Sequence, residues 1–156
     1  MKHSFIIQKL SKSSPSNLIS GAIDLLYLQM KAIGDKKSRS HIETALKISL
    51  SSSNTHTLIA VQDKKIVGIC FFNVCVGIQS GGKYIWINEI FVLENYRNSG
   101  IAKSLLESIE KFALKRKCLY IAGQRDVNNR SSKQLFKSAG YQQNKVVWMD
   151  KKVKLV

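Results

Sequence analysis

A hydrophobic strand that runs into a glycine-containing loop and then a helix constrains this chain more than any other feature. The strand closes from Glu89 to Val92, and a polar loop with Arg97 and Gly100 follows it. Beyond the loop, apolar residues recur at three- and four-residue steps, which predicts a helix over residues 99–116. The first N–H groups of a helix lack internal partners and lie at the positive end of its dipole, so this stretch favours phosphate binding.

The net charge of +15 is the outlier in the composition. It predicts attraction to an anion, which includes nucleic acid, a ribosome, a membrane surface or a phosphorylated cofactor. A solvated, lysine-rich surface is the alternative. The basic residues are scattered, with clusters only at 115–117 and 151–154. Because neither cluster alternates with aromatic residues, a dedicated nucleic-acid module is disfavoured.

A chain of 156 residues suits a single domain, 1–156, with a sizeable core. The sequence contains no run of about 18 apolar residues, so no membrane helix is expected. The apolar run near Phe5 is too short for a signal peptide, and we expect a cytoplasmic protein. Cys70, Cys75 and Cys118 form no Cys-x-x-Cys pair and predict reduced core thiols. The histidines lack metal-ligand spacing, which predicts no metal site.

The pattern of apolar residues predicts an alternation of strands and helices. The strand over 84–92 is apolar on both faces and is expected in the centre of the sheet. Together with the helix over 99–116 and a short strand over 119–122, it forms a βαβ unit. The other expected strands are 5–10, 57–62, 66–72 (or through 76) and 145–149, and the other expected helices are 15–29, 41–50 and 129–139.

Three motifs in order, together with a hairpin at 65–68 that looks like the family's usual strand pair, make the segment 57–141 resemble the GCN5-related N-acetyltransferase (GNAT) superfamily. The pyrophosphate loop of that family reads Arg or Gln, two residues, Gly, one residue, then Gly or Ala, and Arg97 to Ala102 match it. A valine that closes the preceding strand is matched by Val92. The family also places an Asn ahead of a helix that ends in Gly-Phe or Gly-Tyr. Asn129 and Gly140-Tyr141 fall in this spacing.

The resemblance implies an α/β (mixed α+β) GNAT fold. This fold is a single, mostly antiparallel sheet of six to seven strands with about four helices. Its central parallel strand pair splays at the cofactor site. The resemblance also implies an acetyl-CoA-dependent N-acetyltransferase that moves the acetyl group directly to a primary amine, with no metal. A homodimer through exposed strand edges is a habit of the family.

The expected cofactor contacts follow from the same resemblance. Backbone amides around the loop and the Arg97 guanidinium would cradle the pyrophosphate. The alternative is that Gly100 only starts the helix and that Arg97 is a solvated charge. In the family, pantetheine pairs like an extra strand, and an amide near Phe91–Val92 polarises the thioester carbonyl. Asn129 would contact the pantetheine arm or cap its helix. The full set is Phe91, Val92, Arg97, Asn98, Ser99, Gly100, Ile101, Ala102, Lys103, Asn129 and Phe136.

Glu89 is the candidate general base. Strict alternation places it on the same face as Ile87 and Phe91, unless a bulge intervenes. Desolvation among apolar side chains would raise its pKa toward a useful value. The alternative is a solvated glutamate or one bound to backbone amides. Asp126 is the second candidate base. Gln124 stands where several amine-specific relatives carry an acidic residue, but a glutamine side chain cannot act as a base.

The position of the general acid departs from the family. Phe136 stands where a tyrosine is usual, and phenylalanine has no proton to donate. Tyr141, Tyr120 or water are the substitutes. A thiol like that of CoA has a pKa near that of free cysteine, about 8.5, so the thiolate leaves near neutral pH without help at some loss of rate.

These proton-transfer groups favour an α-amino acceptor, whose pKa is about 7.7–8.0, over a lysine-type amine at about 10.4. Few acids are present to line a pocket for aminoglycosides or polyamines. A peptide N-terminus, an amino acid, an amino sugar or an aminoacyl group on RNA remains. Two other functions stay open: a non-catalytic acetyl-CoA-binding domain, on account of Phe136, and an RNA- or ribosome-associated protein, on account of the charge.

Overall fold

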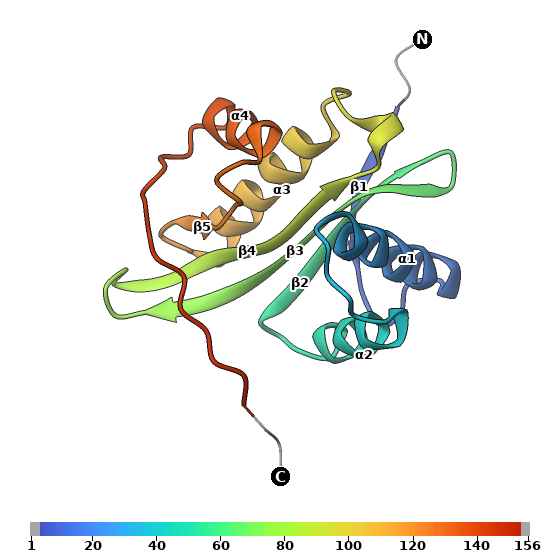
Figure 1. The fold of residues 1–156 in the computed structure, drawn as a ribbon, viewed down its shortest axis with the longest axis horizontal. Helices are drawn as coiled ribbons and strands as arrows, with labels where there is room; N and C mark the ends of the chain where they lie inside the picture. Colours follow the sequence, from blue (N-terminus) through green and yellow to red (C-terminus); the bar gives the residue numbers. More distant parts are fainter. Residues whose placement is uncertain (1–3, 154–156) are drawn as a thin grey trace. The chain divides into compact units, whose positions relative to one another are not determined.

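The computed structural model describes residues 4–153. Within this range five strands and four α-helices follow one another along the chain (Figure 1). They are β1 (Ile6–Leu10), α1 (Ser16–Ala32), α2 (Arg39–Leu50), β2 (Thr55–Gln62), β3 (Lys65–Gly77), β4 (Gly82–Val92), the 3-10 turn η1 (Glu94–Tyr96), α3 (Ile101–Arg116), β5 (Ile121–Gly123) and α4 (Arg130–Ser138).

The strands form one mixed sheet in the order β1-β2-β3-β4-β5. All neighbours are antiparallel except β4 and β5, which are parallel. The predicted α/β class, the single mixed sheet and the four helices are therefore confirmed. The prediction of six to seven strands is wrong for the described residues, which contain five, and the parallel pair lies at the edge of this sheet instead of its centre.

The missing strand is the one predicted over residues 145–149. Within the described chain this segment has no regular secondary structure, and Val147 is 86% exposed. A strand needs a neighbour to satisfy its backbone N–H and C=O groups. Local β propensity therefore does not by itself produce a strand at 145–149.

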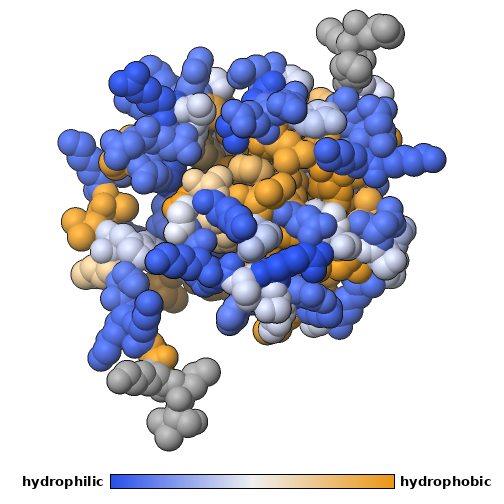
Figure 2. All heavy atoms as spheres, turned by 45° about the vertical axis from the view of Figure 1, so that its right-hand side comes forward, coloured by the Kyte–Doolittle hydropathy of each residue, from blue (hydrophilic) through white to orange (hydrophobic). Residues whose placement is uncertain are grey.

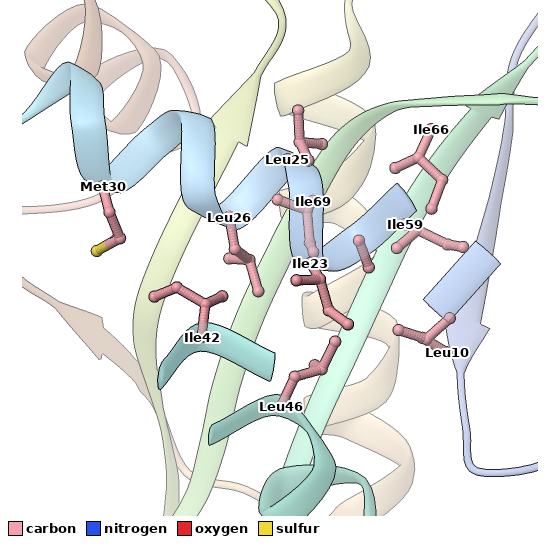
Figure 3. Packing of buried hydrophobic residues seen from close by; sticks show 11 residues of the cluster. Leu10, Ile23, Leu25, Leu26, Met30, Ile42, Leu46, Ile59, Ile66 and Ile69 are labelled. Carbon is pink, nitrogen blue, oxygen red and sulfur yellow. The ribbon is translucent and has the colours of Figure 1, made fainter. Parts of the chain in front are cut away.

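The helices α1 and α2 cover one face of the sheet and α3 covers the other (Figure 1). The first face holds the main hydrophobic cluster, in which side chains of α1 and α2 meet those of β1, β2 and β3 (Figure 3). Alternation along the strands separates the two faces, since successive side chains point in opposite directions. The buried members of the cluster are Leu10, Ala22, Ile23, Leu25, Leu26, Met30, Ile42, Leu46, Ile59, Ile66 and Ile69.

On the other face, β3 approaches the first turn of α3 closely at Gly68. A Cβ atom added to Gly68 would lie 2.7 Å from Ile101 Cγ2 and 3.3 Å from the Cβ of Ala60. Ile101 is the first residue of α3 and is only 1% exposed. The absence of a side chain at Gly68 therefore sets how closely the start of α3 lies on the sheet.

The chain divides into two compact units, one up to Gln124 and one from Arg125 on. The second unit contains α4, after which Gly140 adopts a φ of +82°. The backbone N–H of Tyr141 then donates to the Phe136 carbonyl at 2.9 Å. The rings of the two residues pack in a T-shaped arrangement with their centroids 5.1 Å apart. The expectation of a single domain stays a prediction.

Hydrophilic residues surround the apolar atoms that remain visible on the face in Figure 2. In the described part of the chain no helix combines the length and the apolar character that crossing a bilayer requires. The three cysteines are free thiols: Cys70 is buried, and Cys75 and Cys118 are half-buried.

A buried histidine lies on the α3 face of the sheet. His56 of β2 is 7% exposed and packs against the rings of Phe112 and Phe72, with centroids 4.6 and 5.4 Å away. Neither ring nitrogen has a hydrogen-bond partner among the described residues. Burial, with smaller effects of Lys9 and Arg116, lowers the pKa of His56 to about 4.

We predict that His56 makes folding stability fall in weak acid. Between pH of about 6.5 and about 4, unfolded His56 is protonated while folded His56 is neutral, so the unfolded state binds the extra proton. Acidification through this window is expected to lower the free energy of unfolding by roughly 1–3 kcal/mol. Urea unfolding at several pH values measures this. His56→Phe should flatten the slope of the free energy of unfolding against pH, whereas His41→Gln, at an exposed histidine, should leave it unchanged. Equal slopes in the unaltered protein and both variants would contradict the prediction.

Candidate active site

A β-bulge in β4 decides where Glu89 points. Phe71 of β3 lies opposite Glu89, and the next residue, Phe72, lies opposite Ile87, so Asn88 is an extra residue in β4. Phe72 packs on Phe112 of α3, and Ile87 shares that face. Glu89 lies on the α1 face instead. The alternation expected from the sequence is broken at this point, and Glu89 shares its face with Phe91 but not with Ile87.

The same bulge marks the point where β4 loses its parallel neighbour. β5 pairs with β4 only from Ile85 to Ile87, whereas β4 continues to Val92. Residues 89–92 therefore pair with β3 on one side and have no strand on the other within the described chain. The loss of pairing is consistent with the splay expected at the parallel pair, which stays a prediction.

The alternation of backbone groups identifies which amide faces the open side. The N–H of Leu93 donates to the Val67 carbonyl of β3 at 2.9 Å. Because an antiparallel ladder alternates along the strand, the backbone of Phe91 also faces β3, while that of Val92 faces the open edge. Of the two residues predicted to offer an amide to the cofactor, the structure favours Val92.

The loop after β4 turns twice through the left-handed region. Asn98 has a φ of +59° and Gly100 a φ of +87°, and a Cβ added to Gly100 would meet no atom within 4 Å. Glycine adopts such a φ without strain. No side chain therefore covers the loop backbone at Gly100, and a ligand can approach it there.

The first turn of α3 has N–H groups without helical partners. The helix begins at Ile101, two residues later than predicted, and its first internal bond runs from the Ser104 N–H to the Gly100 carbonyl at 2.9 Å. No side chain caps this end. The hydroxyl of Ser99, the nearest capping group, donates to the Tyr96 carbonyl instead. The amides of residues 101–103 are thus available for an anion.

Arg97 joins this loop to the end of β4. Its Nε donates to the Val92 carbonyl at 3.1 Å, and its guanidinium lies over the Phe91 ring, 5.7 Å from the centroid. The side chain is therefore held at the junction of the open strand edge and the helix start. A fixed positive charge beside uncapped helix amides suits a phosphate ligand.

Glu89 is half-buried and accepts a hydrogen bond from Nε2 of Gln29 in α1. Burial raises the pKa of the Glu89 carboxyl, the bond from Gln29 opposes this effect, and the charge of Asp35 adds to it. The sequence-based expectation of a desolvated carboxylate with a raised pKa therefore agrees with the structure. Gln29 was missed as a site residue, although a glutamine inside the apolar stripe of a helix was a visible signal.

The remaining predicted residues belong to the second unit. Asn129 Oδ1 accepts from the Ser132 N–H at 2.9 Å, so Asn129 caps α4, which was the open alternative to cofactor binding and does not exclude it. Asp126, the second candidate base, is exposed and accepts from the Asn128 N–H. The roles of Asn129 and Phe136 in cofactor binding, and of Tyr141 as the acid, stay predictions.

The described residues contain no group of three or more His, Cys, Asp or Glu side chains that could hold a metal ion. The sequence profile of the acetyltransferase (GNAT) family matches residues 24–141. The chain belongs to the GNAT family. The prediction of an acetyltransferase, made from the motifs between Arg97 and Tyr141, is thereby confirmed.

Solved structures of other GNAT enzymes share the fold. An aminoglycoside acetyltransferase, meta-AAC0020, from an uncultured soil metagenomic sample is 20% identical, with a TM-score of 0.78 over 96% of this chain and 97% of that one. A ribosomal-protein-alanine N-acetyltransferase from Brucella melitensis biovar Abortus 2308 is 17% identical, with a TM-score of 0.78 over 96% and 99%. The aminoglycoside N-acetyltransferase AAC(6')-Iy, solved with a CoA bisubstrate analogue, is 16% identical, with a TM-score of 0.78 over 96% and 99%. No curated protein sequence matches this GNAT chain significantly.

Proposed function

We propose that this GNAT chain transfers the acetyl group of acetyl-CoA to an α-amino group, with Glu89 as the general base. One observation carries the proposal. At the Asn88 bulge, β4 loses β5 as its neighbour and turns a desolvated carboxylate toward α1 within the same short stretch. Acetyl-CoA bound along the open edge of β4 would therefore have a general base, Glu89, on the same strand.

The residues of the first unit fit CoA. The amides of residues 101–103 and the Arg97 guanidinium would hold the pyrophosphate. The Val92 N–H, on the open strand edge, would donate to the thioester carbonyl and stabilise the negative charge that develops there. Acetyl-CoA supplies the reactive acetyl thioester. AAC(6')-Iy, which shares this fold, has been solved with CoA.

The chemistry needs one proton acceptor close to the amine. As the amine nitrogen forms its bond to the acetyl carbon, Glu89 takes a proton from the nitrogen and the C–S bond breaks. A carboxylate whose pKa is raised by burial accepts this proton more readily than an ordinary one. Phe136 cannot protonate the sulfur. A thiolate with a pKa of about 8.5 leaves without an acid near neutral pH.

The surroundings of Glu89 favour a substrate with one positive charge. Its bonded partner, Gln29, is neutral, and Asp35 accepts a hydrogen bond from Lys37 Nζ at 2.8 Å. A polycation would require several uncompensated acids and would be repelled by the net charge of +15. This argument favours a peptide N-terminus or a small α-amine over aminoglycosides, although two of the three solved structures described above are named for aminoglycosides.

Thermal shift measurements with acetyl-CoA, CoA and ATP in parallel test cofactor use. Acetyl-CoA and CoA at about 100 times Kd should stabilise the protein by about 2.7 kcal/mol, which raises Tm by several degrees. ATP should have no comparable effect. A shift with ATP alone would refute the assignment. CoA release with a panel of amines then tests the acceptor, and faster turnover on spermidine or kanamycin than on every α-amine would refute the acceptor class.

A second function is favoured by one residue. Phe136 replaces the usual tyrosine, which suits a domain that binds acetyl-CoA without catalysis. The same experiment separates the two functions, because stabilisation by acetyl-CoA without CoA release on any amine would support the binding domain.

A further inference from the structure

We propose that Gln29, Thr57 and Asn73 form an acceptor-recognition triad that binds neutral hydrogen-bond donors next to the reacting amine. The preferred substrate is then a primary amine with one positive charge and an N–H or O–H donor two or three bonds away. This inference rests on the proposed acetyltransferase function and names the chemistry that selects the acceptor.

The register of the sheet brings the triad to the face of Glu89. Phe71 of β3 lies between Thr57 on one neighbouring strand and Glu89 on the other. Asn73 is two residues further along β3 and so shares this face. Gln29 reaches the same place from α1, since its Nε2 donates to Glu89. Three elements of the chain thus contribute polar groups to the sheet face on which Phe71 and Glu89 lie.

The oxygen atoms of the triad are buried and unused. Gln29 is 7% and Thr57 1% exposed. Within the described residues, Gln29 Oε1, Thr57 Oγ1 and Asn73 Oδ1 have no hydrogen-bond partner. A buried polar atom without a partner lowers stability, and folded proteins rarely keep several together. Their presence on the same sheet face as a candidate catalytic carboxylate points to a ligand as the missing partner.

The chemistry of these atoms defines the ligand. Carbonyl oxygens of Gln29 and Asn73 accept hydrogen bonds, and the Thr57 hydroxyl can accept as well. Because an ionised carboxylate only accepts, Gln29 turns its NH2 group to Glu89 and leaves Oε1 for the ligand. Because Asp35 is bonded to Lys37, the Glu89 carboxylate alone is left to face the ammonium group of the acceptor. α-Amino amides and 2-amino sugars both carry the required donor beside the amine.

Isosteric variants test the triad. Glycinamide and glucosamine are compared with propylamine, which lacks a neutral donor. Thr57→Val and Asn73→Leu are each expected to lower the preference in kcat/KM for the donor-bearing amines over propylamine by about 3–10-fold. Whichever of glycinamide and glucosamine loses more identifies the source of the donor. Thr55→Val is the matched control, because Thr55 has the same face and strand but its hydroxyl already donates to the Ser49 carbonyl.

The Tm of the variants gives a second readout, because a purely structural role of Thr57 would change Tm in the opposite direction from the one expected here. Thr57→Val should leave Tm unchanged or raised in the absence of substrate, because it removes an unpaired hydroxyl, whereas Thr55→Val should lower it. If Asn73→Leu fails to fold, Asn73→Asp replaces it. The added carboxylate is expected to shift preference toward 1,3-diaminopropane, and no shift would count against the triad.

Two failures are distinguishable. If the unaltered protein releases no CoA with any amine, the proposed acetyltransferase function is refuted. If it is active but both Thr57→Val and Asn73→Leu keep the wild-type preference for donor-bearing amines, the acceptor-recognition triad is refuted and the acetyltransferase function stands.

Discussion

Replacing Glu89 by glutamine is expected to lower kcat by about 10²–10⁴-fold, the usual contribution of a positioned general base. Glutamine keeps the size of the side chain and a group for the bond with Gln29, but it cannot take a proton from the amine. CoA release under saturating acetyl-CoA measures the loss. Stabilisation by acetyl-CoA should persist, since the variant leaves the amides of residues 101–103 and Arg97 unchanged.

The same variant has a predicted effect on stability. Burial raises the pKa of Glu89, so the folded state keeps this proton to a higher pH than the unfolded state does. Stability is therefore lost as the pH rises through that range, and Glu89→Gln removes this loss. Tm at neutral pH should stay the same or rise while activity falls. Activity of the unaltered protein should rise with pH, with an apparent pKa above the ordinary glutamate value.

The control for this substitution is Glu43→Gln. Glu43 lies on α2, where its carboxylate pairs with Lys47 Nζ at 2.7 Å and Arg39 lies nearby. Removing its charge is expected to leave kcat unchanged. A loss of less than about threefold in Glu89→Gln would be too small for a general base and would contradict the assignment.

Gly68→Ala is expected to weaken acetyl-CoA binding and to lower Tm by several degrees. The new methyl group would lie 2.7 Å from Ile101 Cγ2, a branch at the Cβ of a buried residue that cannot swing away. Overpacking of this kind costs about 1–3 kcal/mol. Relief of the clash would displace the first turn of α3, whose amides are assigned to the pyrophosphate, so KM for acetyl-CoA should rise with little change in kcat.

A double-mutant cycle checks this reason. Ile101→Ala removes the atom that clashes, so its combination with Gly68→Ala should be less destabilising than the sum of the two. Gly21→Ala is the matched control. Gly21 lies in α1, where the added Cβ would meet only the Ile66 side chain, with Cδ1 nearest at 3.3 Å, and alanine is the better helix former. Additive losses in the cycle would show that the contact with Ile101 is not the cause.

Local patterns in the sequence were sufficient to predict the local structure of the candidate cofactor half of the site. The apolar spacing of Ile101, Leu105 and Ile109 predicted α3, and all three are buried. Gly100 and the motif around it predicted an open helix start, which the φ of +87° and the missing side-chain cap bear out in structural terms. These features depend on neighbours within a few residues, and the sequence carries that information directly.

Pairing between strands decided the acceptor half. Periodicity along β4 placed Glu89 with Ile87, but the register with β3 inserts Asn88 and turns Glu89 to the opposite face. The predicted strand at 145–149 failed for a related reason, since a strand exists only where another satisfies its backbone. Neither outcome is encoded in the order of apolar and polar residues over a short window.

The sequence alone determined the family, and it identified the candidate phosphate-binding loop and the candidate base. Only the tertiary structure decided which polar residues share the sheet face of that base. Gln29, Thr57 and Asn73 come from three elements far apart in the chain, and nothing in their local sequence links them. Sheet register and the packing of α1 bring them to one face, because contacts between distant residues depend on how elements pair, whereas a helix start depends on its own few residues.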